Sequence, residues 1–312
     1  MRVGLIQVDG KLPNLALMKL STWHKAQGDN VTLISPDDVL KGSNLFVIPD
    51  KIYAALVFDG NVSKQSKANM KIAKKLAATG IQIGGTGWDL KSALPPEIES
   101  MKPDYELYGI DYGFGFTARG CIRNCKFCVV PRKEGMIREV AMPVELMNPK
   151  SKELILLDNN FLASSLWREK SQQIIDMRIK VDFTQGLDIR LVDSEKAEYL
   201  AAMKHRKRIH FAFDSLQTEK EVRHGIELLL SQGINHDRLS FYVLVNFNSN
   251  IEQDLKRIAI LDEYGVNSFV MIYEKQTAPQ ELKNLARWCN KYQTKKSCAF
   301  KDYDPHYRAK GA

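Results

Sequence analysis

Residues 120–128 read Gly120-Cys121-Ile122-Arg123-Asn124-Cys125-Lys126-Phe127-Cys128. Three of the five cysteines of the chain therefore lie in one short run, as a C-x3-C-x2-C pattern. Three thiolates on one loop can ligate three irons of a [4Fe–4S] cluster, whereas clusters that only carry electrons are usually held by four cysteines. The fourth iron is then open to a small molecule. The spacing therefore predicts chemistry at an open iron.

A zinc site is the alternative explanation, because zinc is also bound by clustered cysteines. Structural zinc takes four ligands, commonly two C-x2-C pairs. The remaining cysteines, Cys289 and Cys298, are far downstream and nine residues apart. Cys289 falls in a helical stretch, where a buried thiol is common. We favour the iron–sulfur interpretation and expect both downstream cysteines to serve packing.

The cysteine run resembles the cluster loop of the radical S-adenosylmethionine (radical SAM) superfamily, including the aromatic Phe127 directly before the third cysteine. The resemblance implies that Cys121, Cys125 and Cys128 hold a [4Fe–4S] cluster and that S-adenosylmethionine (SAM) binds its open iron. It further implies reductive cleavage of SAM to a 5′-deoxyadenosyl radical, which abstracts hydrogen from a substrate. An electron donor such as flavodoxin or ferredoxin is the implied partner.

Length and composition limit the possible classes of protein. A chain of 312 residues suggests about two domains. Hydrophobic content of 44% and charged content of 26% are ordinary for a globular protein. The sequence contains no run of ~18 apolar residues, so it predicts no membrane-spanning helix. Without a signal-peptide pattern or a disulfide framework, we expect a cytoplasmic protein without a membrane partner. The net charge, 45 − 37 = +8, is compatible with nucleic acid.

The first hundred residues alternate strand-like and helix-like segments, which predicts an open parallel sheet with helices on its faces. The expected strands are 3–8, 31–34, 53–58 and 81–83, and the expected helices are 14–27 and 65–78. Pro95, Pro96 and Pro103 then interrupt the pattern, so we place a domain boundary near residue 104. Residues 1–104 are predicted to form a Rossmann-like domain.

A second alternation follows residue 104. Its six expected strands are 112–117, 153–157, 180–184, 208–213, 239–245 and 268–273, separated by helices such as 194–204, 219–232 and 251–264. Six units are fewer than the eight of a closed barrel. Residues 105–287 are predicted to form a partial (β/α)6 TIM-type barrel, which the resemblance also implies. Residues 288–312 are expected to be a helix end and a tail.

Polar residues follow the second strand of this predicted barrel, where functional groups collect in parallel α/β folds. In radical SAM proteins the end of this strand contacts the amino group of SAM, and Asp158 and Asn159 match that position. The usual Gly-Gly-Glu form is absent. The alternative is an N-cap or Asx turn that opens the next helix.

The third and fourth predicted strands end in further polar groups. Gln185, Asp188 and Arg190 are candidates for contacts with SAM, although Asp188 and Arg190 can equally form a structural ion pair. Asp214, after the fourth strand, is a candidate to bind a ribose hydroxyl. Its alternative role is helix capping, by Asp214 itself or by Ser215.

The first domain resembles the cobalamin-binding module that precedes some radical SAM domains, and the stretch 129–135 after the cysteines supports this. The D-x-H-x-x-G loop of that module is absent, and His24 is expected on the surface of a helix. Gly84 and Gly85 match the module's late glycine pair; alternatively, residues 85–87 bind phosphate at a helix start. We interpret the domain as a relic or a substrate-docking module, with base-off cobalamin as the less favoured alternative.

Three functions compete. The first is a radical SAM enzyme acting on an unidentified small metabolite or nucleic acid. The second is a methylthiotransferase or methyltransferase of the same superfamily. Methylthiotransferases hold a second cluster with three cysteines of an N-terminal domain, and residues 1–120 contain none. The third is a zinc-dependent nucleic-acid-binding protein.

Overall fold

The structure is a computed structural model that describes residues 1–42 and 48–306. Its residues group into two compact units. Unit 1 comprises Met1–Asn124 and Val129–Asp158; unit 2 comprises Cys125–Cys128 and Asn159–Ala312. The predicted domain boundary near residue 104 thus falls inside unit 1. Within the described residues, no helix has the length and apolar character needed to cross a membrane.

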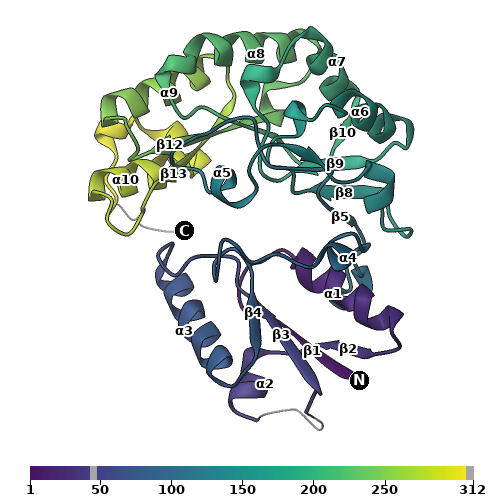
Figure 1. Cartoon of the computed structure of the whole chain (residues 1–312). Coiled ribbons are helices and arrows are strands. Elements are labelled where there is room, and N and C mark those ends of the chain that lie inside the picture. Colours follow the sequence, from purple (N-terminus) through teal and green to yellow (C-terminus); the bar gives the residue numbers. More distant parts are fainter. Residues whose placement is uncertain (43–47, 307–312) are drawn as a thin grey trace. The chain divides into compact units, whose positions relative to one another are not determined.

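Unit 1 contains a four-stranded parallel sheet in the order β2-β1-β3-β4 (Figure 1). Its strands are β1 (Arg2–Gln7), β2 (Asn30–Leu33), β3 (Lys51–Ala55) and β4 (Gln82–Gly84). Its helices are α1 (Leu15–Ala26), α2 (Pro36–Leu40), α3 (Lys64–Ala78) and α4 (Pro96–Glu99). The four predicted strands and both predicted helices are confirmed, with small shifts at their ends.

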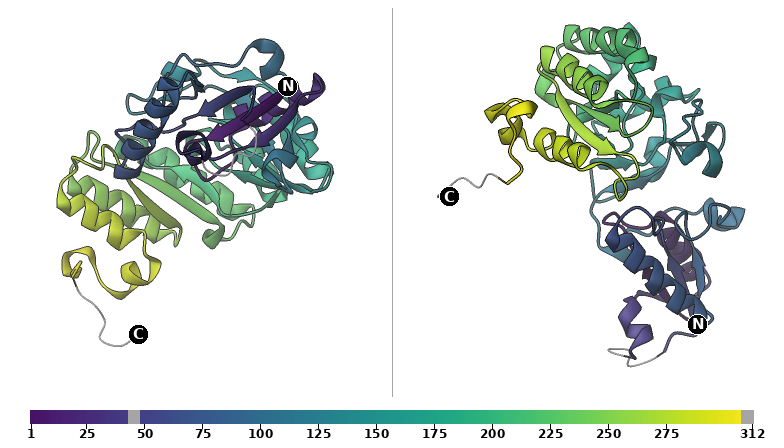
Figure 2. Two further views of the ribbon diagram at one scale, coloured as in Figure 1. Left: turned by 90° about the horizontal axis from the view of Figure 1, so that it is seen from below. Right: turned by 90° about the vertical axis from the view of Figure 1, so that its left-hand side faces the viewer.

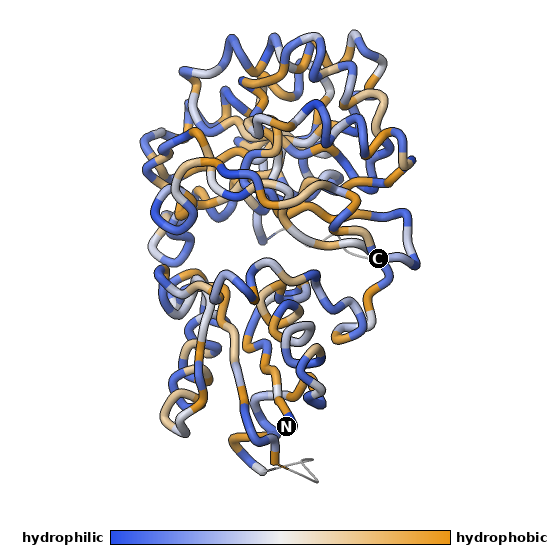
Figure 3. Tube along the Cα trace, turned by 45° about the vertical axis from the view of Figure 1, so that its right-hand side comes forward, coloured by the Kyte–Doolittle hydropathy of each residue, from blue (hydrophilic) through white to orange (hydrophobic). Residues whose placement is uncertain are grey.

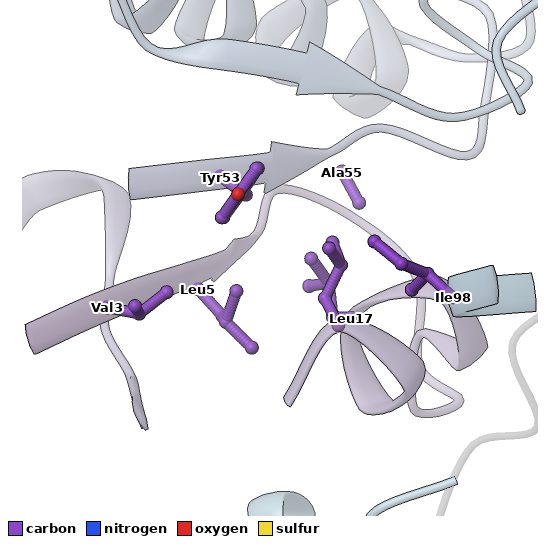
Figure 4. Packing of buried hydrophobic residues seen from close by; sticks show 7 residues of the cluster. Val3, Leu5, Leu17, Tyr53, Ala55 and Ile98 are labelled. Carbon is purple, nitrogen blue, oxygen red and sulfur yellow. The ribbon is translucent and has the colours of Figure 1, made fainter. Parts of the chain in front are cut away.

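Helices cover both faces of this sheet. On one face, Val3, Leu5, Tyr53 and Ala55 pack against Leu17 of α1 and Ile98 of α4 (Figure 4). On the other face, Ile6 and Ala54 pack against Leu76 of α3. This alternation along β1 and β3 is the period of two that a strand buried on both sides requires.

His24 is buried, not on the surface as predicted. It is 1% exposed, and its Nδ1 lies 2.6 Å from a carboxylate oxygen of Asp29. Its Nε2 lies 3.1 Å from the Tyr53 hydroxyl. The polar neighbours of His24 along the chain suggested exposure, but the ring faces β3. The imidazole therefore serves the core of unit 1.

Four further strands belong to unit 1. β5 (Gly113–Gly115) pairs in parallel with β8 (Glu153–Leu156), and β6 (Ala118–Arg119) pairs antiparallel with β7 (Arg138–Glu139). The short helix α5 (Val130–Lys133) lies between β6 and β7 along the chain. The two predicted strands 112–117 and 153–157 are confirmed as β5 and β8. The antiparallel pair was not predicted.

Unit 2 contains a parallel three-stranded sheet, β11-β12-β13, and a parallel pair, β9 with β10. The strands are β9 (Lys180–Phe183), β10 (Lys204–His205), β11 (Ile209–Ala212), β12 (Leu239–Val245) and β13 (Asn267–Ile272). The helices are α6 (Trp167–Asp176), α7 (Ser194–Ala202), α8 (Glu219–Ser231), α9 (Ile251–Glu263), α10 (Gln280–Cys289) and α11 (Tyr292–Ser297). Figure 2 shows α10 beside this sheet.

All four strands predicted for unit 2 are confirmed, and so are the three predicted helices. Gly233 and Gly265 follow α8 and α9 with φ of 82° and 66°, the left-handed conformation that favours glycine after a helix. Hydrophobic stretches alternate with hydrophilic ones along the chain in each unit (Figure 3). The chain is thus a mixed α/β protein with parallel sheets, and the partial barrel stays a prediction.

Two details of unit 2 differ from expectation. The predicted helix 194–204 ends at Ala202, and Lys204 and His205 instead form strand β10, which pairs with β9. The predicted tail contains α11 and a 3-10 turn at Phe300–Asp302. The indole of Trp288 donates a hydrogen bond to the carbonyl of Cys298 and so attaches this segment to α10. Residues 307–312 of the predicted tail lie outside the described residues.

Candidate functional site

The loop that carries the cysteines is closed at its base within unit 1. The pairing of β6 with β7 joins Arg119 to Arg138, and the Cys121 N–H donates to the Gly135 carbonyl at 3.2 Å. Gly120 has φ of +87°, and a Cβ there would lie 2.3 Å from the Met136 carbonyl oxygen. Only glycine fits so close an approach. The sequence predicted the cysteines but not this requirement directly before them.

Charged side chains also hold the base of the cysteine loop in place. The guanidinium of Arg119 forms a bidentate pair with Glu134, at 3.0 and 2.7 Å, and a third bond to Glu99 at 2.9 Å. Burial raises the pKa of the Glu134 carboxyl, but hydrogen bonds and charge from Arg119 outweigh it and hold the pKa below its ordinary value. A bidentate pair of this kind fixes geometry as well as charge. The two halves of the loop base are therefore held in one register.

Asp158 lies at the carboxyl end of β8 and is 4% exposed. Its carboxylate accepts hydrogen bonds from the backbone N–H groups of Thr117, at 2.7 Å, and Ala118, at 2.9 Å, and from the Thr117 hydroxyl. Because β5 and β8 run parallel, both chain segments leave the sheet at the same end. Asp158, predicted to contact SAM, holds the start of the cysteine loop. It is not the N-cap of the next helical turn, Phe161–Ala163, because Asn160 occupies that position.

The three cysteines are half-buried, and none forms a disulfide within the described residues. Within unit 1, the Arg123 N–H donates to the Cys121 sulfur at 3.3 Å. Within unit 2, the Cys128 N–H donates to the Cys125 carbonyl at 3.0 Å and so forms a turn. Across residues 1–42 and 48–306, no three His, Cys, Asp or Glu side chains already form a metal-binding group. The case for a cluster therefore depends on the donor chemistry and on the spacing.

Phe127 packs on aromatic residues at the carboxyl ends of two strands. Its ring meets Phe247, two residues after β12, edge to face with centroids 5.3 Å apart. Phe247 in turn meets Tyr273, one residue after β13, at 5.0 Å. The resemblance predicted an aromatic residue at position 127, but not its partners. An aromatic residue within two positions of the end of each apolar strand was the signal in the sequence.

The loop after β9 carries an ion pair. The carboxylate of Asp188 accepts two bonds from the Arg190 guanidinium, at 2.6 and 3.0 Å, and one from the Arg190 N–H. Asp188 and Arg190 therefore form the structural ion pair that was the alternative to a contact with SAM. Burial opposes the charge of Arg190, but bonds to Asp188 and the charges of Asp188, Cys125 and Asp214 raise its pKa. Arg190 is thus a fixed cation near Cys125.

Asp214 follows β11 and does not cap a helix, because Ser215 caps the 3-10 turn Leu216–Thr218. In the described part of the chain, its carboxylate accepts one hydrogen bond, from the Leu244 N–H at 3.3 Å. Burial raises its pKa, although Arg257 and Arg190 oppose the shift. A carboxyl with so few partners at a strand end has remaining capacity to bind a hydroxyl.

Arg257, which was not predicted from the sequence, contacts the carboxyl ends of β11 and β12. It is fully buried, donates to the carbonyls of Phe213 and Leu244 at 2.7 Å, and pairs with Asp254. The ends of β11 and β12 are thereby held together. Its only signal in the sequence was an arginine on the apolar side of a predicted helix.

The two remaining candidates differ in exposure. Gln185 is exposed. Gly186 beside it has φ of +83°, a conformation that favours glycine, and a Cβ there would lie 3.3 Å from the His210 carbonyl oxygen. Asn159 is half-buried and is the first residue of unit 2 after Asp158. Cys125, Cys128, Asp188, Arg190 and Asp214 belong to unit 2, whereas Cys121 belongs to unit 1.

Gly85, one of the two glycines matched to the cobalamin module, lies in closely packed backbone of unit 1. A Cβ on Gly85 would lie 2.3 Å from the Leu56 carbonyl oxygen, so the glycine allows this close packing. The buried carboxylate of Asp9 accepts the N–H groups of Val57 and Phe58, which ends β3 before its predicted limit at residue 58. No helix begins at residues 85–87, so the helix start on which the phosphate alternative depends is absent there. We derive no chemistry through cobalamin.

Comparisons of the chain with models of protein families, with curated proteins and with solved structures found no match.

Proposed function

We propose that the chain is a radical SAM enzyme in which Cys121, Cys125 and Cys128 hold a [4Fe–4S] cluster. The observation that carries the proposal is the C-x3-C-x2-C run with Phe127 before its last cysteine. When bound, such a cluster supplies the electron that cleaves SAM to methionine and a 5′-deoxyadenosyl radical, which takes hydrogen from a substrate. The chain's own residues bind, orient and shield these groups.

The donor set fits an iron–sulfur cluster. None of the three cysteines forms a disulfide within the described residues, so their sulfurs can act as thiolate ligands. The Cys121 sulfur accepts a hydrogen bond from the Arg123 N–H, and Arg190 is a cation near Cys125; both contacts suit a ligating sulfur. Gly120, Arg119 and Asp158 fix the base of the loop, and Phe127 anchors its turn. These contacts support a loop arranged before the metal binds.

SAM carries an amine, a carboxylate and two ribose hydroxyls. In the proposal, Arg190 is the cation available to the carboxylate, and Asp214 accepts from a hydroxyl. Asn159, after β8, and Gln185, after β9, supply amides. Asp158 positions the cysteine loop and stays, with Asn159, the candidate at the end of β8 for the amine of SAM. The substrate is a small metabolite or a nucleic acid, and no residue beyond these contacts is assigned to the hydrogen abstraction.

The test is anaerobic reconstitution followed by metal and sulfide analysis. We expect about four irons with matching sulfide per chain, and 5′-deoxyadenosine after reduction with SAM. The variant with alanine at Cys121, Cys125 and Cys128 should lose both signals. The matched control, with Cys289→Ala and Cys298→Ala, should keep them, because Cys289 is buried against Ser268 and Cys298 lies beyond α10. One zinc and no iron would instead favour the nucleic-acid binder.

A further inference from the structure

Helix α3 of unit 1 carries an unusual charge distribution. Five of its fifteen residues are lysines, at positions 64, 67, 71, 74 and 75, and all five are exposed. The helix has no acidic residue, and none occurs anywhere between Gly60 and Trp88. A chain with 37 acidic residues among 312 would ordinarily interrupt such a run. The positive charge of α3 is therefore concentrated.

The five lysines lie on one side of the helix. At about 100° per residue, they fall within an arc of about 100°. Ser66, Ala73 and Leu76 are buried on the opposite side, and Leu76 packs against Ile6 and Ala54 of the sheet. The helix is attached to unit 1 by its apolar face, so the lysine face points away from the core. We call these five residues the lysine stripe.

The lysine stripe has no partner within the part of the chain that the structure describes. None of its five ammonium groups takes part in an ion pair, a hydrogen bond or a cation–π contact there. Other lysines of unit 1 are paired: Lys19 with Glu99, Lys25 with Asp104 and Lys41 with Asp37. The charge of the stripe is therefore available to an external polyanion.

The length of the stripe matches a nucleic-acid backbone. From Lys64 to Lys75 the helix rises about 16 Å. One strand of a duplex presents a phosphate about every 3.4 Å along its axis, so about five phosphates face the stripe. Lysines act as point charges and contact phosphates without reading sequence. A membrane surface fits less well, because interfacial helices insert an apolar face and that of α3 is buried.

An exposed aromatic residue precedes the stripe. Phe58 is 47% exposed, and its backbone N–H is held by Asp9 at 2.8 Å. A Cβ on Gly87 would lie 2.5 Å from the Phe58 carbonyl carbon, so the backbone at Phe58 is closely packed. The exposed ring of Phe58 precedes Lys64 by six residues, and an exposed aromatic ring can stack on an unpaired base.

We propose that the lysine stripe of α3 binds the sugar–phosphate backbone of a nucleic acid without sequence specificity. The proposal does not depend on the [4Fe–4S] cluster. It can hold if unit 2 has another chemistry, and it can fail while the radical SAM proposal stands.

The test compares two triple variants of the full chain by fluorescence anisotropy. One carries Lys67→Gln, Lys71→Gln and Lys74→Gln; the control carries Lys220→Gln, Lys291→Gln and Lys301→Gln at exposed positions of unit 2. Both lower the formal net charge from +8 to 8 − 3 = +5. The probes are a labelled 20-base-pair DNA duplex, a 20-nucleotide RNA, and anionic phosphatidylserine vesicles, each measured at several salt concentrations.

The stripe variant should bind the duplex at least about tenfold more weakly at low salt, with a salt slope shallower by about 2–3, as three lost phosphate contacts require. The control should match the wild type. Equal losses in both variants would overturn the proposal, since net charge alone would then explain binding. So would unchanged binding by the stripe variant, or binding to vesicles and to neither nucleic acid. Circular dichroism checks that α3 is retained, because glutamine has a helix propensity close to that of lysine.

Discussion

The carboxylate of Asp158 holds the backbone of Thr117 through an N–H bond of 2.7 Å and a bond to its hydroxyl. Both residues are buried. The strand β8 thereby fixes the point at which the cysteine loop leaves β5. A residue expected at the cofactor thus supports the segment that would hold it.

Asp158→Asn should destabilise unit 1 and reduce cluster loading. The amide replaces one acceptor oxygen with a donor, so a buried N–H of Thr117 or Ala118 loses its partner, at a cost of about 1–3 kcal/mol. Thermal unfolding and iron content after reconstitution measure the two effects. Asp111→Asn, at an exposed position, is the control. Full stability and full iron content in Asp158→Asn would contradict the positioning role.

Gly120→Ala should be more disruptive than Gly135→Ala in the same loop. Both glycines have positive φ, but a Cβ at 120 would lie 2.3 Å from the Met136 carbonyl oxygen, whereas a Cβ at 135 meets nothing within 4 Å. Gly135→Ala therefore measures only the conformational cost, about 1 kcal/mol or more. The melting temperature of Gly120→Ala should fall further. Equal melting temperatures would show that the close approach does not constrain the loop.

Phe127 and Phe247 should be energetically coupled. A double-mutant cycle with Phe127→Leu, Phe247→Leu and the double variant isolates their edge-to-face contact, for which about 0.5–1.5 kcal/mol is typical. Urea unfolding of the apo protein gives the coupling without any cluster. Strictly additive effects would mean that the turn Cys125–Cys128 is not anchored by this contact.

The stabilisation that Asp214 gives to the folded state of unit 2 should decrease as pH rises. Its pKa is raised above the ordinary 3.8, mainly by burial, so the folded state binds the proton more tightly than the unfolded chain. The resulting stabilisation is complete below pH ~3.8 and is lost as pH rises through the raised pKa. Relative to Asp214→Asn, the wild type should therefore lose melting temperature between pH 4 and pH 7. A difference that is constant over this range would contradict the assigned shift.

The sequence predicted most strands because runs such as Leu239–Val245 combine β-branched and aromatic residues between turn signals. It also predicted the ends of α8 and α9, because Gly233 and Gly265 favour the left-handed conformation that follows a helix. These signals depend on residues that are neighbours in the sequence, and the conformations that such residues favour are the ones seen in the folded chain.

The errors concern contacts between residues that are distant in the chain. His24 looked exposed because its partner Tyr53 lies 29 residues away. The contact of Asp158 with Thr117, 41 residues earlier in the chain, was likewise not predicted. Arg257 and its two carbonyl partners were missed for the same reason. Strand ends could be located from the pattern, but the partners of their side chains could not.

The most direct measurement is electron paramagnetic resonance of the reconstituted, reduced protein before and after SAM is added. The proposal predicts the signal of a reduced [4Fe–4S] cluster whose g values shift with SAM, because SAM binds the iron that no cysteine ligates. The variant lacking Cys121, Cys125 and Cys128 should show neither signal. A cluster signal that SAM leaves unchanged, or a protein that binds zinc and no iron, would contradict the account.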